Sequence, residues 1–421
     1  MKRKAILLLI SILISLKIFA QEQYFLLKPD RVFDGKDIHT NWWVLVKGKK
    51  IEAVGDPSTI KIPASVKIIE LKGTTLMPGM IEGHSHLFLH PYNEASWNDQ
   101  VLTESRAERT ARAVEHAKAT LMAGFTTIRD LGTEGAGYDD VGLKSAINKG
   151  IIPGPRMLVA TRAIVATGSY GPKSNVTEAV LPIGAEQADG SEGLTRAIRS
   201  QIGYGADVIK LYADYRWGVN GTAAPTFTLD ELKTAVQVAG SSGRQVVVHS
   251  GTEEGMRRAI AAGVRTIEHG DGGTPEIFKQ MKVKSIALCP TLAATEAISS
   301  YKGWKKGIDA DPEAVKHKHE IFTEALKAGV TICMGGDVGV FTHGDNAREM
   351  LLMAEYGMKN IDVLRSATSV NADVFELKDL GNIKAGYLAD IIAVEGNPAE
   401  DIKVVKQVRL VMKDGVVYLQ K

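Results

Sequence analysis

The chain has 421 residues, of which 44% are hydrophobic and 24% charged, and this composition excludes a disordered, collagen-like or polytopic membrane protein. Its formal net charge of +2 depends on four basic residues within the first twenty positions, which contain no acid. Without these four, 47 of the 51 basic residues remain, against 49 acidic ones. The resulting net charge of −2 indicates no surface for binding nucleic acid.

Residues 1–20 have the pattern of a cleavable signal peptide. Lys2-Arg3-Lys4 precedes an apolar run over residues 5–16, and Ala20 supplies a small residue at the expected cleavage point. An uncleaved membrane anchor is the alternative, but the run is short against the roughly 20 residues that span a bilayer, and Lys17 ends it. We therefore expect a secreted or periplasmic protein that has no membrane contact after cleavage.

Both ends of the mature chain are rich in short β-branched and aromatic runs. Glycines separate these runs in residues 21–75, and Asp414-Gly415 is a two-residue hairpin signal within residues 380–421. We predict one small β-sandwich that is built from both ends. Its expected strands cover residues 24–27, 42–47, 50–54, 66–71, 390–394, 404–412 and 416–419.

The middle of the chain, residues 76–379, alternates short apolar runs with helical patterns. Eight such runs over about 300 residues are typical of an α/β protein with a (β/α)8 TIM-like barrel. A doubly wound open sheet is the alternative, but residues 79–83 lack the glycine-rich phosphate turn that it predicts after the first strand. The expected barrel strands cover residues 76–81, 126–131, 157–160, 208–211, 245–249, 266–268, 286–288 and 330–334.

Metal-compatible side chains occur at or just after the ends of five of these runs, where the site of a barrel forms. Spacing of two in an extended segment places the imidazoles of His84 and His86 on one face, so that they can share a metal. Imidazole and carboxylate suit zinc and similar divalent ions, whereas Lys210 needs deprotonation or modification before it can ligate. The candidate ligands are His84, His86, Lys210, His249, His269 and Asp337.

Two further patterns are interpreted as structural. His317-Lys318-His319 also has the H-x-H spacing, but it lies in a helical segment where residues two apart diverge by about 200°, which predicts solvated surface. Cys289 and Cys333 lie alone in apolar runs, which favours two core residues over a disulfide.

The motifs P-G-x-I-x-x-H-x-H, I-K, V-V-H, I-E-H-G and G-G-D occur in this order, and with them the mature chain resembles the amidohydrolase superfamily. The similarity is to the branch with imidazolonepropionase-like proteins, metal-dependent Xaa-Pro dipeptidases and carboxypeptidases, and it extends to ochratoxin-hydrolysing amidases. The resemblance implies a distorted (β/α)8 barrel with a β-sandwich from both termini.

The resemblance also implies two divalent metal ions, with zinc as the expected metal. It places His84 and His86 on a buried ion and His249 and His269 on a more exposed one. Lys210 would be carboxylated and bridge both ions, and Asp337 would act as ligand and proton shuttle. Homo-oligomerisation is a further expectation, since relatives commonly self-associate.

The sequence also departs from the relatives. Glu82 stands where many relatives carry Asp, and its longer side chain is expected to serve as a supporting group. Dipeptidase relatives often have His-x-Tyr after the fifth strand, whereas this chain has His249-Ser250-Gly251. The candidates for the missing substrate contact are Tyr212, Tyr215, Arg216 and, in a segment that matches relatives, His343.

These observations predict hydrolysis of an amide whose amine side is an amino acid with a free carboxylate. Arg216 with Tyr212 and Tyr215 would bind that carboxylate. The expected substrates are dipeptides, N-acyl aromatic amino acids or ochratoxin-type amides. Two alternatives stay open: a cyclic-amide hydrolase like imidazolonepropionase, and a non-catalytic metal- or ligand-binding protein.

Overall fold

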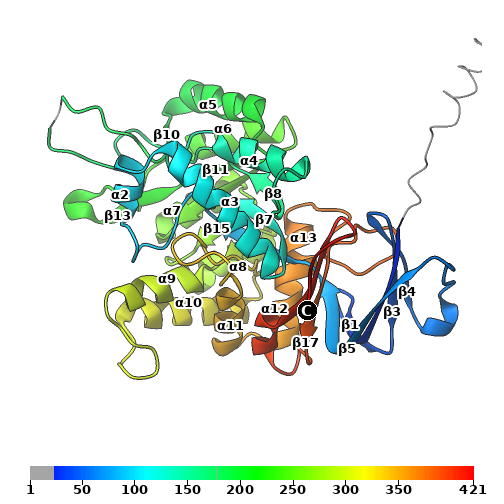
Figure 1. The fold of residues 1–421 in the computed structure, drawn as a ribbon. Coiled ribbons are helices and arrows are strands. Elements are labelled where there is room, and N and C mark those ends of the chain that lie inside the picture. The colour runs from blue at the N-terminus through cyan, green and yellow to red at the C-terminus, as the bar shows by residue number, and fades with distance from the viewer. Residues whose placement is uncertain (1–22, 177) are drawn as a thin grey trace, which may run out of the picture.

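The computed structural model describes residues 23–176 and 178–421. The signal peptide predicted over residues 1–20 lies outside these residues. In Figure 1 the strands of both ends, coloured blue and red, lie side by side next to a larger body formed by the middle of the chain. Within the described residues, no helix has the length and apolar character needed to cross a bilayer.

Both ends of the chain contribute to one eight-stranded sheet, which confirms that they fold together. Its strands are β1 (Tyr24–Phe33), β2 (Ile38–Thr40), β3 (Trp43–Lys47), β4 (Lys50–Gly55), β5 (Lys67–Pro78), β17 (Ile391–Glu395), β18 (Val408–Lys413) and β19 (Val416–Gln420). The order is β19-β18-β17-β5-β1-β3-β4, and β2 pairs with β1 outside this path. Strand β5 joins the two ends because it pairs in parallel with β1 and antiparallel with β17.

The hairpin predicted at Asp414-Gly415 connects β18 to β19. Both turn residues have positive φ, 50° for Asp414 and 71° for Gly415, as a two-residue type I′ turn requires. Lys413 pairs with Val416 across the turn in an antiparallel ladder. The hairpin prediction is therefore confirmed.

The middle of the chain forms parallel strands that alternate with helices. One sheet has the order β6-β7-β8, with β6 (Met80–Ser85), β7 (Phe125–Asp130) and β8 (Arg156–Val159). The other has the order β10-β9-β11-β14-β15-β16, with β9 (Ile164–Val165), β10 (Glu186–Gln187), β11 (Val208–Tyr212), β14 (Gln245–Ser250), β15 (Thr266–His269) and β16 (Ala287–Cys289). A short hairpin, β12 (Asp214–Arg216) with β13 (Ala223–Pro225), follows β11.

The last predicted barrel strand connects the two parallel sheets, although not as a regular strand. One isolated parallel bridge joins Leu288 to Ile332, and a second joins Ser85 to Val338. The segment therefore runs between β16 and β6, as an eighth barrel strand does. The prediction of a regular strand over residues 330–334 is wrong, because the pairing is limited to these single positions.

The first predicted barrel run, residues 76–81, is divided between two sheets. Strand β5 ends at Pro78 and β6 begins at Met80. Gly79 lies between them and donates its N–H to the carbonyl oxygen of Asp390 at 2.8 Å. A Cβ atom at this position would lie 2.0 Å from Oγ1 of Thr126, so the close approach needs glycine. The chain thus passes from the shared sheet into the barrel at Gly79.

Helices follow the parallel strands and cover them in Figure 1. Several begin with a side-chain cap; Thr228 and Glu231, for example, form a capping box at the start of α6. The helices are α2 (Trp97–Leu102), α3 (Arg106–Met122), α4 (Asp139–Asn148), α5 (Gly190–Tyr204), α6 (Leu229–Gly240), α7 (Glu253–Ala262), α8 (Pro275–Val283), α9 (Leu292–Tyr301), α10 (Glu313–Ala328), α11 (Ala347–Glu355), α12 (Asn360–Arg365) and α13 (Asn371–Val374).

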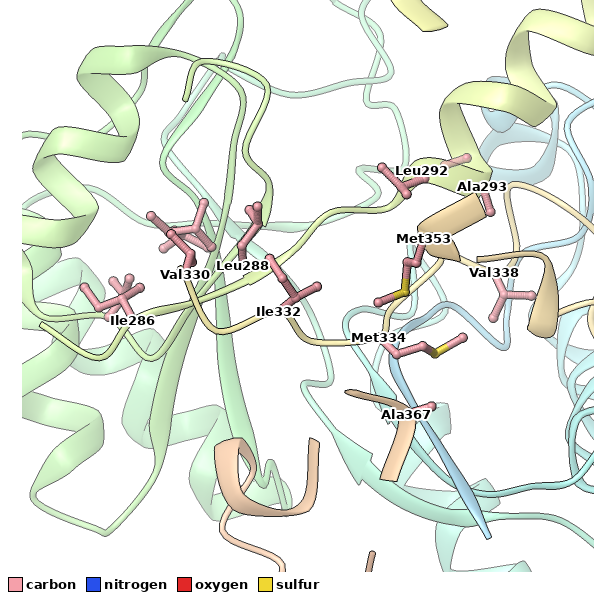
Figure 2. Close-up of a cluster of buried hydrophobic side chains, with 14 of the residues drawn as sticks. Ile286, Leu288, Leu292, Ala293, Val330, Ile332, Met334, Val338, Met353 and Ala367 are labelled. Atoms are coloured by element: carbon pink, nitrogen blue, oxygen red, sulfur yellow. The ribbon is translucent and has the colours of Figure 1, made fainter. Parts of the chain in front are cut away.

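The largest apolar core lies between the barrel strands and the surrounding helices. Figure 2 shows part of it, in which Ile332 and Met334 lie between Leu288 of β16 and Met353 of α11. These four side chains are almost completely buried. Burial of a side chain of this size stabilises the folded state by about 1.5–3 kcal/mol. The core therefore fixes the segment that leads to Asp337.

The two patterns interpreted as structural are largely confirmed. His317 and His319 are exposed on α10, and Cys289 and Cys333 are buried and unpaired. Lys318 is the exception, because it is only 3% exposed although its position was included in the predicted surface. Helical geometry explains the difference: Lys318 is rotated by about 100° from each of its two neighbours and lies on the buried face of α10, with Val315 and Phe322.

Candidate metal centre and substrate cavity

The six predicted metal ligands come together at the carboxyl ends of the barrel strands. His84 lies in β6, Lys210 in β11 and His249 in β14. Five of the six, all but Lys210, line one cavity of about 700 Å³. Parallel strands of a barrel end at the same face, so residues far apart in the sequence meet there.

The imidazoles of His84 and His86 are both held through Nδ1. The Nδ1 atom of His84 lies 2.9 Å from a carboxylate oxygen of Glu268, and that of His86 lies 2.8 Å from the carbonyl oxygen of Gly132. Both partners are acceptors only, so Nδ1 carries the proton in each ring. Each Nε2 atom therefore has a free lone pair.

These two Nε2 atoms face each other and a carboxylate. They lie 3.3 Å apart, and Oδ1 of Asp337 lies 3.5 Å from His84 Nε2 and 3.4 Å from His86 Nε2. Three electron-rich atoms at such distances repel one another unless a cation lies among them. Two neutral imidazoles and a carboxylate are ligands that suit zinc and similar ions. The residues present therefore fit a divalent metal ion.

The remaining histidines extend this centre. The Nδ1 atom of His269 lies 2.8 Å from Oγ1 of Thr291, which donates its own proton to the carbonyl oxygen of Pro290. The ring of His249 lies 4.4 Å from that of His269 and stacks on Tyr212 at 4.7 Å. Burial lowers the pKa of both histidines, that of His249 to about 4. Both are thus neutral at neutral pH, the form that binds metals.

Lys210 lies on β11, is not among the residues that line the cavity and is 1% exposed. Burial lowers the pKa of its amine, although the nearby carboxylates of Glu268 and Asp337 oppose this shift. Its Nζ atom lies 5.6 Å from the centre of the Tyr212 ring. The position and the chemistry of this amine are compatible with the carbamate that the resemblance implies.

A buried ion pair that we did not predict lies behind His84. Glu268, which accepts from His84, also accepts from Nη2 of Arg129 at 2.8 Å. Arg129 donates in addition to the carbonyl oxygen of Gly83 at 2.7 Å. Both members of the pair are at most 1% exposed. The pair therefore fixes the His84 ring and the backbone of β6 next to it.

Glu82 has the supporting position that we expected. Its carboxyl group accepts from the backbone N–H groups of His84 and Gly336, at 3.0 and 2.9 Å, and from the side chain of Asn346 at 3.1 Å. Burial raises the pKa of Glu82 to about 7. The contacts connect β6 to the turn that carries Asp337.

Lys318 of α10 also supports the centre. Its Nζ atom donates to the carbonyl oxygen of His269 at 3.0 Å and to Oδ1 of Asp271 at 2.5 Å. The contact holds the loop after β15, and His269 is the last residue of that strand. A lysine in the middle of an amphipathic helix gave no sequence signal for this role.

Some residues that line the cavity have a strained backbone. Four non-glycine residues with positive φ line it, and their φ values are 48° for Glu134, 72° for His269, 53° for Thr291 and 63° for Asp337. Such conformations are uncommon outside glycine and persist where the surrounding structure imposes them. Strain of this kind is typical of functional sites.

The predicted carboxylate clamp is only partly compatible with the structure. Tyr212, Tyr215 and Arg216 all line the cavity, and Arg216 is exposed to solvent. The hydroxyl of Tyr212, however, lies 3.4 Å from the carboxylate of Glu134. A second carboxylate would be repelled there, so Tyr212 does not suit an anion. Arg216 is the cationic member of the predicted clamp.

His343 lies behind the cavity lining. Its Nε2 atom lies 3.0 Å from the carbonyl oxygen of Leu89, and its ring stacks on His116 at 4.2 Å. Burial lowers the pKa of His343. This placement supports the loop after His86 and does not favour the substrate contact that we predicted.

Together the barrel-like fold and the buried imidazole–carboxylate centre define a metal-dependent hydrolase. The model of the amidohydrolase family matches residues 75–418, and the chain belongs to this family. Ochratoxinase from Aspergillus niger is 31% identical over 364 residues, which cover 80% of this chain and 73% of that protein.

Solved structures agree with this assignment. A Xaa-Pro dipeptidase with methionine bound in its active site superposes with a TM-score of 0.83 at 32% identity, over 94% of this chain and 100% of the other. The A. niger ochratoxinase structure gives 0.80 at 27% identity, over 95% and 96% of the two chains. The predicted superfamily branch and the TIM-barrel-like fold class are thereby confirmed, and the chain is a hydrolase of amide bonds.

Proposed function

We propose that this chain is an exported amidohydrolase with two divalent metal ions, expected to be zinc, that releases an amino acid with a free α-carboxylate. Its proposed substrates are of two types, dipeptides and N-acyl aromatic amino acids, and the second type includes ochratoxin-type amides. The observation that carries the proposal is the set of imidazole and carboxylate lone pairs that converge at an open cavity of about 700 Å³. Two exposed cations, Arg216 and Lys302, also line that cavity.

The chain offers ligands for both ions. His84 and His86 would hold one, His249 and His269 the other, and Asp337 would complete the set. Lys210 would be shared as a carbamate, formed when its neutral amine attacks carbon dioxide and releases one proton. When bound, divalent ions polarise the scissile carbonyl and lower the pKa of water.

Asp337 is positioned for proton transfer. It faces His84 and His86 from the cavity wall, and burial raises the pKa of its carboxyl group. In the proposed reaction it accepts a proton from the attacking water and delivers it to the nitrogen of the leaving amino acid.

Arg216 is the proposed contact of the substrate carboxylate. Its guanidinium is solvent-exposed on β12, and the cavity offers Lys302 as a second cation. Guanidinium and carboxylate form charge-assisted, often bidentate hydrogen bonds. A carboxylate held there would leave the scissile amide directed towards the histidines.

Export and assembly are part of the same proposal. Residues 1–20 support cleavage after Ala20 and a secreted or periplasmic location. We also propose that the mature chain forms homo-oligomers and that its barrel spans residues 76–379, between the sheet segments 21–75 and 380–421.

The test compares acetyl-phenylalanine, a Xaa-Pro dipeptide and the carboxamide-capped form of each on zinc-loaded protein. Capping should lower kcat/KM by about tenfold or more, because the charge-assisted bond is lost. Arg216→Ala should remove most of this difference, while Arg199→Ala on the outer helix α5 should not. Equal rates for capped and free substrates would contradict the proposed carboxylate contact.

A further inference from the structure

We propose that Glu134 and the aromatic rings around it form a subsite for an organic ammonium group, so that the acyl side of the substrate carries a free α-amine. The assignment to a substrate rests on the proposed function. It distinguishes the two proposed substrate types, because dipeptides carry this amine and N-acyl amino acids do not.

Glu134 lies in the loop after β7 and lines the cavity. It is 2% exposed. Three side chains donate to its carboxylate: Nε1 of Trp97 at 3.0 Å, the hydroxyl of Tyr170 at 2.7 Å and the hydroxyl of Tyr212 at 3.4 Å. All three are neutral donors, so they orient the carboxylate without neutralising its charge.

The charge of Glu134 has no cationic partner within ion-pair distance among the described residues. The nearby guanidinium of Arg109 donates to the carbonyl oxygens of Phe88 and Thr133 instead. An ionised carboxylate offers about four acceptor positions, of which the three donors leave one free. A buried charge without a counter-ion is costly, and a bound cation would remove this cost.

The surroundings of the carboxylate favour an organic cation. The ring of Tyr170 lies 5.1 Å from that of Trp97, 4.8 Å from that of Tyr212 and 4.8 Å from that of Tyr215. These four rings line the same cavity as Glu134. Aromatic faces attract ammonium groups, and aromatic cages are used to recognise them. Rings and carboxylate together provide the chemistry that selects a protonated amine.

The subsite is one residue away from the metal centre. Tyr212 stacks its ring on His249 at 4.7 Å and directs its hydroxyl to Glu134. An ammonium group at Glu134 would therefore lie close to the scissile carbonyl at the histidines. In a dipeptide the α-amine is one carbon from that carbonyl, whereas a basic side chain carries its ammonium group farther away.

The positive φ of Glu134, 48°, is consistent with a functional position. Glycines at 132 and 135, with φ values of 144° and 97°, flank this residue and allow the loop to turn sharply. The loop thus places an acidic residue with a strained backbone in the cavity wall.

The first experiment measures binding without catalysis. Choline and its uncharged isostere 3,3-dimethylbutan-1-ol are titrated into zinc-loaded protein by calorimetry; a quaternary ammonium cannot lose a proton and become a metal ligand. Choline should bind about tenfold more tightly than the isostere. Glu134→Gln should abolish the difference. Equal binding of the two probes to the wild-type protein would overturn the proposal.

Two further variants control this comparison. Glu104→Gln removes a partly buried carboxylate that pairs with His90 and should leave the choline preference unchanged. Trp97→Phe keeps an aromatic ring but removes one donor to Glu134, and should reduce the preference by a smaller factor. A preference for choline that persists in Glu134→Gln would assign the cation to another site and contradict the inference.

The second experiment compares the hydrolysis of Ala-Phe, propionyl-Phe and 6-aminohexanoyl-Phe, which carry an α-amine, no amine and a distal amine. Ala-Phe should exceed propionyl-Phe in kcat/KM by about 10–100-fold. Glu134→Gln should bring the two values together by lowering kcat/KM for Ala-Phe alone. An equal loss for both substrates would show a structural role instead. Preference for 6-aminohexanoyl-Phe would overturn the α-amine assignment.

The two experiments separate this inference from the proposed function. If none of the amides is hydrolysed but choline binding depends on Glu134, the subsite stands and the proposed function fails. If acetyl-phenylalanine and propionyl-Phe are hydrolysed best and choline shows no preference, the proposed function stands and the subsite is refuted.

Discussion

Glu268→Gln is the substitution for which the structure predicts a large loss of both folding stability and zinc affinity. The Glu268 carboxylate accepts from Nδ1 of His84 at 2.9 Å, from Nη2 of Arg129 at 2.8 Å and from Oγ1 of Thr266 at 2.5 Å, and it is fully buried. Glutamine has nearly the same volume but only one acceptor oxygen. Its amide group would therefore face a donor, either His84 or Arg129, and the guanidinium would lose its counter-ion.

Two separate magnitudes follow from these contacts. An unpaired buried guanidinium should lower the free energy of unfolding of the metal-free protein by about 3–5 kcal/mol. Loss of the carboxylate that orients His84 should weaken zinc binding by about 10–100-fold. Urea unfolding of the metal-free protein measures the first quantity, and competition with a chelator measures the second.

Glu254→Gln is the matched control, since it removes an exposed carboxylate of α7 that pairs with Arg258 at 2.8 Å. Such a helix-surface pair contributes about 0.3–0.5 kcal/mol, and zinc binding should not change. If Glu268→Gln matched this control in both stability and zinc affinity, the role assigned to the buried pair would be refuted.

Two more predictions concern Lys318 and Asp140. Lys318→Met should weaken zinc binding about tenfold, because His269 loses the support of its loop, while Lys327→Met on the same helix should not; equal affinities in a chelator competition would contradict this. Burial raises the pKa of Asp140 from 3.8 to about 7, so the folded chain retains a proton that the unfolded chain releases. The free energy of unfolding should therefore fall by up to about 1.4 kcal/mol per pH unit as the pH rises from 3.8 to about 7. Asp140→Asn should flatten that slope in urea unfolding at pH 5 and pH 7, and an unchanged slope would refute the assignment.

The metal centre was predictable from the sequence because its signals are local. His84 and His86 follow an apolar run at a spacing of two, and His249 ends another such run. Barrel topology then brings the ends of these strands together, whatever their distance in the sequence. The structure places all six predicted ligands accordingly, although their metal-binding roles stay predictions.

The supporting residues were not predictable, because their roles leave no local signal in the sequence. Arg129 lies within a β-strand and Lys318 within a helix, where a charged side chain ordinarily indicates a solvated face. Their burial depends on partners that are distant in the sequence. Arg129 pairs with Glu268, more than a hundred residues away, and Lys318 pairs with Asp271, 47 residues away. Such pairs follow from the packing of the barrel and leave no pattern in the sequence.

Strand limits were predicted less well than strand positions. The run at 76–81 was predicted as one strand because it is apolar, but Pro78-Gly79 within it is a turn signal, and the chain divides there between two sheets. The run at 330–334 is as apolar as its neighbours, but it pairs only at Ile332. Hydrophobicity reports burial in both cases, whereas the ladder depends on the direction of the neighbouring strands.

The most direct test of the central claim is the hydrolysis of Ala-Phe by metal-stripped protein during titration with zinc, with Asp337→Asn in parallel. We expect no activity without metal and a recovery that saturates at two equivalents of zinc per chain. The Asp337→Asn variant should retain most of its bound metal but lose turnover. Hydrolysis that survives complete removal of the metal, or undiminished turnover in Asp337→Asn, would contradict the proposed metal-dependent mechanism.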